Sequence, residues 1–265
     1  MRGEERVKFI YNEAAVIVTA EDVSHLVIGD LHIGAEKKLI NRGIRVYSAV
    51  EAMAKKVKKL MGEFSLNNII ILGDVKDTIL YPDSWELNEL RKFFSLLSEY
   101  RIAVIRGNHD AHLEELIDVE IKDELLVGDF AFMHGHKWPS EEAMMKKYVF
   151  VGHNHAAVSM VDKNKGFYSQ KAWLIASLNK SKAAETYKKF NNDVKLVVLP
   201  AFNDLITGMP VNEVLEKNEH LSPLFRNGVF VYGKAKIYSL RGEIIGTPSS
   251  VKTEKKKREG RGRLT

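Results

Sequence analysis

Acidic and imidazole side chains recur in five short groups whose residue types suit metal binding. Six of the nine histidines lie within these groups. Carboxylate, imidazole and amide side chains together are typical ligands of divalent transition metals. Two such cations about 3.5 to 4 Å apart can bind one phosphate and activate water. We therefore predict a two-metal site that hydrolyses phosphate esters. The groups are Asp30-Leu31-His32, Gly73-Asp74-Val75-Lys76-Asp77, Gly107-Asn108-His109-Asp110, His134-Gly135-His136 and Gly152-His153-Asn154-His155.

The predicted ligands have different roles. Asp30 and His32 are two residues apart, so on an extended segment their side chains point the same way and bind one ion together. Asp74 is expected to bridge both ions, because it follows a strand and a glycine that permits a tight turn. Asn108 offers a neutral carbonyl oxygen to the second ion. The histidines that complete the two shells are His134, His153 and His155.

His109 is the predicted general acid. It directly follows Asn108, and the carboxylates of Asp77 and Asp110 can orient its ring and raise its pKa. With hydroxide bridging the metals as the nucleophile, no nucleophilic side chain is required. His136 lies close enough in the sequence to contact the substrate.

The metal is expected to be manganese, with iron, zinc or nickel as alternatives. Mixed nitrogen and oxygen ligands suit these ions better than calcium, which prefers oxygen alone. The chain has no cysteine. This excludes disulfides, thiolate zinc sites and a cysteine nucleophile.

Each group alone has a simpler explanation. A Gly-Asp pair can cap a helix, and Gly-Asn-His-Asp can form a turn. The five groups, however, all follow short apolar runs, which read as buried strands. The carboxyl ends of such strands form the ligand-binding edge of open α/β sheets. The runs cover residues 25–29, 69–72, 103–105, 130–133 and 149–151.

The other elements are predicted from periodicity. Residues 7–11 and 14–19 read as a hairpin, and residues 46–64 and 85–100 as amphipathic helices that alternate with strands. This order predicts a mainly parallel first sheet. After residue 150 we expect a more antiparallel second sheet packed on the first, with a helix only at 181–190. Its strands are predicted at 157–161, 172–178, 194–199, 229–232, 235–239 and 243–247.

The five groups resemble the motifs of the calcineurin-like metallophosphoesterase superfamily over residues 26–155. The resemblance implies an α/β fold, a four-layer α/β/β/α sandwich of two mixed sheets. It also implies that His109 protonates the leaving group and that Asp77 pairs with it, as in the nuclease branch. The implied ligands are Asp30, His32, Asp74 and His155 for one ion, and Asp74, Asn108, His134 and His153 for the other.

A narrower resemblance lies further along the chain. Ala172-Trp173-Leu174, residues 196–203 and Thr207-Gly208 resemble the small DNA-ligase-associated phosphoesterases and their archaeal relatives. These relatives are linked to the nuclease subunit of a DNA-repair complex. We therefore expect a phosphodiesterase that acts on nucleotides or nucleic acid. The alternatives are a phosphomonoesterase with the same site and a non-catalytic scaffold in a DNA-repair assembly.

Charge and composition suggest how the 265 residues are organised. Residues 251–265 hold seven basic and two acidic side chains, so they account for the whole net charge of +5. We expect residues 1–250 to form the metallophosphoesterase domain and residues 251–265 a basic, disordered tail. Such a tail is either a nucleic-acid contact or simply solvated.

The expected location of the chain is the cytoplasm. The N-terminus lacks the pattern of a signal peptide, and apolar runs fall short of the ~18 residues of a membrane span. No membrane partner is expected. The exposed sheet edges would permit a homodimer.

Overall fold

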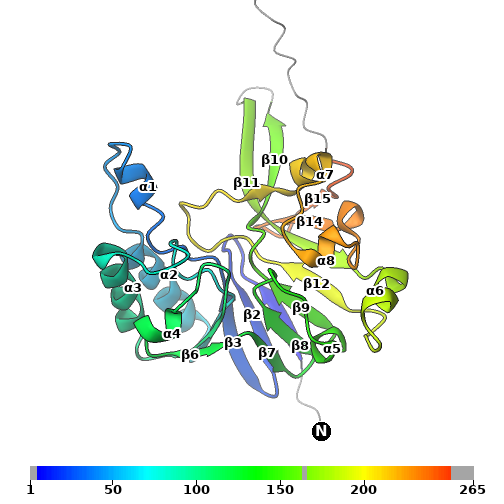
Figure 1. The fold of residues 1–265 in the computed structure, drawn as a ribbon, viewed down its shortest axis with the longest axis horizontal. Coiled ribbons are helices and arrows are strands. Elements are labelled where there is room, and N and C mark those ends of the chain that lie inside the picture. Colours follow the sequence, from blue (N-terminus) through cyan, green and yellow to red (C-terminus); the bar gives the residue numbers. More distant parts are fainter. Residues whose placement is uncertain (1–4, 163–165, 252–265) are drawn as a thin grey trace, which may run out of the picture.

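The computed structural model describes residues 5–162 and 166–251, and within them two β-sheets pack face to face (Figure 1). The first sheet has six described strands in the order β1-β2-β3-β4-β5-β6. Strands β1 to β3 pair antiparallel, and β3 to β6 pair parallel. The parallel half is the predicted βαβαβ unit. The strands are β1 (Arg6–Phe9), β2 (Val16–Ala20), β3 (Val23–Ile28), β4 (Asn68–Ile71), β5 (Arg101–Ile105) and β6 (Glu120–Lys122).

The second sheet has nine described strands, with the path β13-β10-β11-β12-β9-β8-β7, and with β14 paired to β11 and β15 paired to β14. It mixes parallel pairs, such as β8 with β9, and antiparallel pairs, such as β10 with β11. Its strands are β7 (Glu124–Val127), β8 (Phe130–Met133), β9 (Tyr148–Val151), β10 (Ala156–Asp162), β11 (Gly166–Ser177), β12 (Lys195–Val198), β13 (Met209–Pro210), β14 (Lys236–Ser239) and β15 (Ile244–Gly246).

Helices cover the outer faces of both sheets. Helices α2 and α3 pack on the first sheet, and α5 to α8 pack on the second. The helices are α1 (Lys37–Ile40), α2 (Val50–Glu63), α3 (Ser84–Leu96), α4 (Leu113–Leu116), α5 (Glu141–Met144), α6 (Lys180–Thr186), α7 (Val211–Lys217) and α8 (Pro223–Arg226), with a short 3₁₀ helix at Tyr232–Lys234.

Three apolar clusters hold the layers together. One joins α2 and α3 to the first sheet, and another joins the second sheet to its own helices. The third lies between the sheets, where Val27 and Ile70 face Phe132 and Phe150. Each sheet is covered by helices on one face and by the other sheet on the opposite face. Because side chains alternate between the two faces of a strand, nearly all of those in central strands such as β4, β8 and β9 are buried, and these strands are continuous apolar runs in the sequence. The predicted four-layer α/β/β/α sandwich is confirmed.

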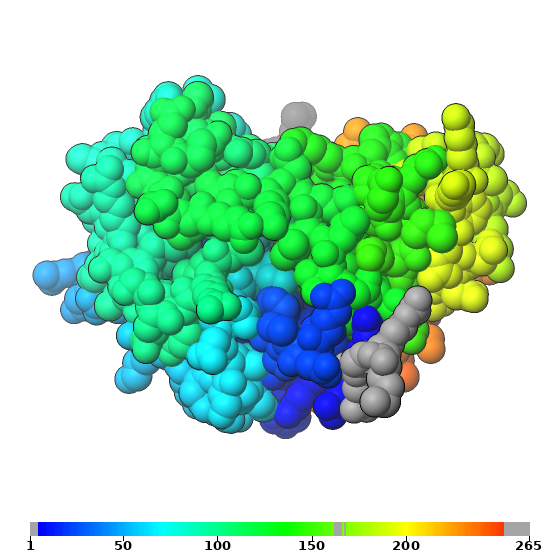
Figure 2. All heavy atoms as spheres, turned by 90° about the horizontal axis from the view of Figure 1, so that it is seen from below, coloured from blue at the N-terminus to red at the C-terminus, as the bar shows by residue number. Residues whose placement is uncertain are grey.

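Seen from below in Figure 2, the green segment runs across the face from the teal side on the left to the yellow side on the right, above the blue N-terminal residues. This segment includes β6, β7 and β8, through which the chain passes from one sheet to the other. No helix of the described residues has both the length and the apolar character needed to span a membrane.

Some predicted elements differ from the structure. Residues 229–232 do not form a strand, since Phe230 makes only an isolated bridge to Leu178. The expectation of one helix after residue 150 is wrong, because α7 and α8 are also helical. Helix α2 begins at Val50, four residues later than predicted. The tail prediction falls on residues that, apart from Val251, lie outside the described part of the chain.

Candidate metal centre

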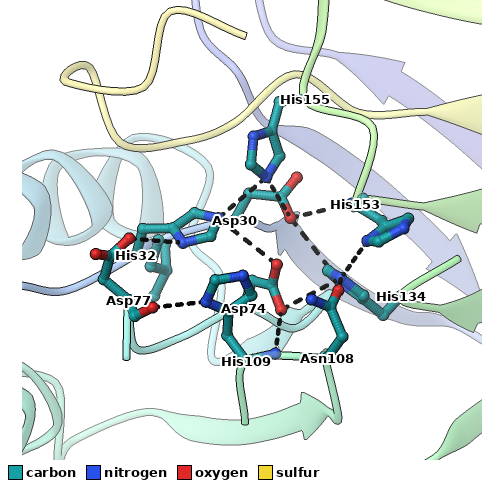
Figure 3. Close-up of polar contacts among 12 residues, drawn as sticks. Asp30, His32, Asp74, Asp77, Asn108, His109, His134, His153 and His155 are labelled. Atoms are coloured by element: carbon teal, nitrogen blue, oxygen red, sulfur yellow. Dashed lines mark hydrogen bonds and ion pairs between the residues drawn. The ribbon is translucent and has the colours of Figure 1, made fainter. Parts of the chain in front are cut away.

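The turns after β3 and β4 continue the parallel pairing of these strands and bring the first two motifs together. The Asp30 amide donates to the Gly73 carbonyl at 3.0 Å, and the His32 amide donates to the Asp74 carbonyl at 2.9 Å. The Asn203 side chain donates to the Leu31 carbonyl at 2.7 Å and fixes the same turn. Asp30, His32 and Asp74 therefore lie side by side at the carboxyl edge of the sheet (Figure 3).

Several predicted ligands have a left-handed backbone. Among them φ is 56° at Asp30, 41° at His32 and 50° at Asp74. The extended segment expected for Asp30 and His32 is therefore wrong, although both side chains still point into one cluster. His153 and His155 are also left-handed, with φ of 63° and 40°. Such conformations cost about 1–3 kcal/mol each and concentrate at functional sites.

The first group of ligand atoms joins both sheets. Asp30, His32, Asp74 and His155 place one donor atom each within 4.8 Å of one another. His155 Nε2 lies 3.0 Å from His32 Nε2 and 3.4 Å from Asp30 Oδ1. His155 follows β9, whereas the other three side chains follow strands of the first sheet. In this group, side chains from both sheets therefore meet.

The second group contains Asp74, His134 and His153, with Asn108 beside them. His134 Nε2 is 3.3 Å from Asp74 Oδ1, 3.1 Å from Asn108 Oδ1 and 3.2 Å from His153 Nδ1. The other His134 nitrogen, Nδ1, donates to the Leu72 carbonyl at 2.7 Å, which fixes the ring and directs Nε2 toward the cluster. Asp74 belongs to both groups, which suits a shared carboxylate.

The donor atoms fit divalent cations. Asp30 Oδ2 is buried and has no hydrogen-bond donor among the described residues. Imidazole nitrogens also meet at hydrogen-bond distance, His32 with His155 and His134 with His153. A buried carboxylate oxygen needs a partner, and a cation among these lone pairs would supply one.

Burial and charge shift the pKa values within the cluster. Burial disfavours the charged form of His134, but hydrogen bonding to Asp74 and the charges of Asp74 and Asp30 outweigh it, raising its pKa to about 9. Burial and the charge of His134 lower the pKa of His153 to about 4. The same two causes lower the pKa of His136 to about 4. Both rings are therefore neutral at pH 7, as metal or substrate contacts by their lone pairs require.

His109 lies at the edge of the cluster, with its main chain and ring both held. Its amide donates to Asp74 Oδ1 at 2.9 Å, and its ring Nδ1 donates to the Asp77 carbonyl at 2.6 Å. The Asp77 carboxylate instead faces His32 Nδ1 at 3.4 Å and the Lys38 ammonium at 2.8 Å. Asp77 therefore contacts His109 through its backbone, not through the predicted carboxylate.

Asp110 does not orient His109. Its carboxylate is buried and accepts hydrogen bonds from the amides of Val75 and Gly107, at 2.9 and 2.8 Å. Asp110 thus shapes the turns that carry Asp74 and Asn108.

The structure also reveals contributors that the motifs did not assign. Lys76, Glu86 and Asn203 are buried polar residues that bind the turns of the centre. Lys76 lies inside the second motif, so its position in the sequence could have indicated that it contributes to the centre. Glu86 and Asn203 are distant in the sequence, and periodicity could not connect them with the site.

His136 lies beside the second group. Its ring centroid is 5.2 Å from that of His134 and 6.1 Å from that of His153. Its Nδ1 is buried and has no hydrogen-bond partner among the described residues. Contact between His136 and the substrate therefore stays a prediction.

Comparison with known proteins gives the following matches. The family model of the calcineurin-like phosphoesterases matches residues 24–199. The crystal structure of the Pseudomonas putida nuclease MPE aligns with a TM-score of 0.52 at 17% identity, covering 90% of this chain and 98% of that one. YfcE, a phosphoesterase from E. coli, aligns with a TM-score of 0.37 at 14% identity, covering 84% and 96%. No curated protein matches the chain.

The family match covers well over half of the chain and includes all five motifs and every predicted ligand. The likeness to the Pseudomonas structure supports the same fold. The chain therefore belongs to the calcineurin-like phosphoesterase family and is a metal-dependent phosphoesterase.

Proposed function

We propose that the chain is a phosphodiesterase that acts on nucleotides or nucleic acid. The carrying observation is the position of His109, half-buried at the edge of the metal-binding cluster. Its Nδ1 proton is directed at the Asp77 carbonyl, so Nε2 is the nitrogen left to hold a proton for the substrate. Alkoxide leaving groups of nucleic acids need such a proton, because they are strong bases.

Two divalent cations, most favourably manganese, are the proposed cofactors. Bound there, they would supply the Lewis acidity that activates water and neutralises charge on the phosphate. The donor sets are those of the two groups described above. The residues proposed to hold one ion are Asp30, His32, Asp74 and His155, and those proposed to hold the other are Asp74, Asn108, His134 and His153.

An exposed basic arm, residues 37–49, supports nucleic acid as the substrate. It projects from the body beside the centre and carries α1 (Figure 1). The arm has four basic and no acidic side chains. Lys37 and Lys38 pair with Asp83 and Asp77, whereas Arg42 and Arg45 make no ion pair with a described carboxylate.

The arm also exposes an aromatic ring. Tyr47 is 89% exposed, and with Lys56 it lines a cavity of about 250 Å³ at the base of the arm. Free guanidinium groups and an exposed ring are the two elements that bind phosphates and stack bases in single strands. The nuclease name of the Pseudomonas structure and the resemblance to DNA-ligase-associated phosphoesterases agree with this substrate class.

The complete ligand set argues for catalysis over a scaffold role. The predicted ligands and His109 lie in one cluster, and five ligands adopt a strained backbone to reach it. A scaffold would have no use for that strain. The proposed scaffold alternative therefore lacks a supporting observation in the described residues.

Hydrolysis of small chromogenic esters tests the proposal. Metal-stripped protein with manganese restored is assayed on bis(4-nitrophenyl) phosphate and 4-nitrophenyl phosphate, beside the Asp74→Asn variant. We expect preferential cleavage of the diester, and loss of it in Asp74→Asn because the shared carboxylate is removed. Preferential cleavage of the monoester would instead identify a phosphomonoesterase. Two bound metals without turnover of either ester would contradict catalysis.

A further inference from the structure

Lys76 is a fully buried lysine whose ammonium binds four main-chain carbonyls. Its Nζ lies 2.6 Å from the carbonyl oxygen of Thr78, 2.8 Å from that of Ile79 and 2.6 Å from that of Leu80. The fourth partner is the carbonyl of His109, at 2.5 Å. An ammonium has three N–H donors, so every donor is used and at least one is shared. Lys76 thus joins residues 78–80 to His109.

Glu86 binds the N–H groups at the start of the same segment. Its carboxylate is buried and accepts from the amides of Asp77 and Thr78, at 3.0 and 2.9 Å. It also accepts from the Thr78 hydroxyl at 2.6 Å. An anion therefore binds the N–H groups of residues 77–78 and a cation binds the carbonyls of residues 78–80. Two buried charged side chains therefore satisfy both ends of the peptide dipoles in this turn.

The orientation of the His109 ring depends on this turn. Its Nδ1 donates to the Asp77 carbonyl, directly before the carbonyls that Lys76 binds. At its main chain, His109 is held by Asp74 and by Lys76. If the ammonium were removed, the four carbonyls that converge on the buried Lys76 side chain would lose their donor. Carbonyls that face an apolar side chain without a donor are unfavourable, so the turn would rearrange toward solvent and the Asp77 carbonyl would move from the ring.

We propose that Lys76 is a positioning residue for His109, acting through the turn of residues 77–80. The inference rests on the proposed function, because it assigns a task to the leaving-group acid. The Lys76 ammonium binds main-chain carbonyls alone among the described residues, and it reaches the cluster only through the carbonyl of His109. It fixes the ring through the Asp77 carbonyl, so that Nε2 faces the leaving-group oxygen. Glu86 fixes the start of the same turn through the amides of Asp77 and Thr78.

Leaving-group dependence tests this role. Bis(4-nitrophenyl) phosphate releases a weakly basic phenolate, whereas thymidylyl-thymidine releases an alkoxide that needs a proton. We expect Lys76→Met to lower kcat about 100-fold on the dinucleotide and by less than about threefold on the chromogenic diester. The His109→Asn variant should show the same pattern. Equal losses on both substrates would overturn the positioning role.

A double-mutant cycle separates positioning from general damage. In the His109→Asn background, Lys76→Met should cost less than about twofold on the dinucleotide, because the acid it positions is already absent. A full loss in that background would overturn the proposal. Lys171→Met is the matched control, since the Lys171 ammonium binds the carbonyls of Ala201 and Asn203 at 2.7 and 2.8 Å. Its effect should add to that of His109→Asn.

A spectroscopic measurement on the metal-free protein gives a readout other than turnover. The Nδ1 proton of His109 should appear as a protected, low-field nitrogen-bound NMR signal in the wild type and in Lys171→Met. It should be lost in Lys76→Met and weakened in Glu86→Gln, which keeps the side-chain volume and serves if Lys76→Met does not fold. Persistence of the signal in folded Lys76→Met and in Glu86→Gln would refute the link.

The two proposals fail in different ways. If wild-type protein with manganese cleaves neither diester, the proposed function is wrong, while the NMR signal still reports whether Lys76 fixes the ring. If the diesters are cleaved but Lys76→Met retains dinucleotide turnover, only the positioning role is wrong.

Discussion

Asp74 is the residue on which the centre depends most. Its carboxylate lies 3.3 Å from His134 Nε2 through Oδ1 and 3.6 Å from His32 Nε2 through Oδ2. Burial raises the pKa of Asp74, but hydrogen bonding to His134 and the nearby imidazole charges outweigh it and hold the pKa well below its usual range. The group is therefore ionised at neutral pH, which a shared metal ligand requires.

Replacing Asp74 with asparagine removes this charge and keeps the shape. We expect Asp74→Asn to bind fewer than two manganese ions and to lose on the order of 100-fold or more in turnover. Calorimetry and elemental analysis of dialysed protein measure the stoichiometry. Asp118→Asn, at an exposed carboxylate, is the control and should retain both ions. Two tightly bound ions in Asp74→Asn would refute the bridging assignment.

At the scale of elements, the turn after β4 shows how closely the motifs pack. Gly73 has a φ of 75°, and a Cβ added there would lie 2.6 Å from His134 Nδ1 and 2.7 Å from the Gly107 amide nitrogen. Only glycine permits both the left-handed backbone and this close approach of two turns. The glycine thus allows Asp74 to meet a histidine from the other sheet.

A methyl group at position 73 should separate these turns. We expect Gly73→Ala to lower the free energy of unfolding by about 2–4 kcal/mol, from left-handed strain and overpacking together. Gly43→Ala is the matched control, because Gly43 has a φ of 77° but open space around its Cβ, so it carries the strain alone. Urea unfolding of metal-free protein compares them, and equal losses would contradict the packing argument.

The arm that carries α1 is the second element on which the proposed substrate class depends. Its two ends are joined by Glu36, whose buried carboxylate accepts from the Ala49 amide at 2.6 Å. Residues between these ends are mostly exposed and include the two arginines without an ion pair to a described carboxylate. A protruding, anchored and cationic element suits the phosphates of a strand that leads to the centre.

Charge reversal in the arm should weaken nucleic-acid binding. We expect Arg42→Glu with Arg45→Glu to reduce the affinity for a fluorescein-labelled single-stranded oligonucleotide. The plot of log K against log salt concentration has a negative slope, and its magnitude should decrease by about 1.4, or about 0.7 for each lost phosphate contact. Lys188→Glu with Lys189→Glu reverses two exposed charges next to α6 and should change the affinity less. Equal effects of both pairs would exclude a specific role of the arm.

At the scale of the whole molecule, the predicted ligands come from both sheets. Asp30, His32, Asp74 and Asn108 follow strands of the first sheet, whereas His134, His153 and His155 follow strands of the second. Apolar packing between Val27, Ile70 and the second sheet already joins the layers. Bound cations would cross-link the two sheets at the edge where the predicted ligands lie.

Metal binding should therefore stabilise the entire fold. Manganese at 100 times its Kd should raise the free energy of unfolding by about 2.7 kcal/mol per independent site, because the unfolded chain lacks the assembled ligands. Thermal unfolding of chelator-treated and manganese-loaded protein measures this difference. Asp74→Asn should show a smaller increase. A Tm that does not respond to manganese would contradict a site shared between the sheets.

The sequence by itself determined the chemistry of the centre and most of the elements that carry it. Each motif directly follows an apolar run, and this local order predicted β3, β4, β5, β8 and β9 and the ends at which the ligands lie. It also predicted the parallel half of the first sheet, because strand and helix periods alternate there. Short helices without a clear hydrophobic period, such as α7 and α8, could not be predicted from this local order.

Only the tertiary structure decided how individual atoms are used. The Asp77 carbonyl holds His109 while its carboxylate turns to His32 and Lys38. Lys76 binds His109 across 33 positions, and Asn203 reaches Leu31 across 172. These contacts depend on left-handed turns and on the packing of two sheets. Local periodicity carries no information on them, because it reports which face of an element is buried and not which distant backbone group it meets.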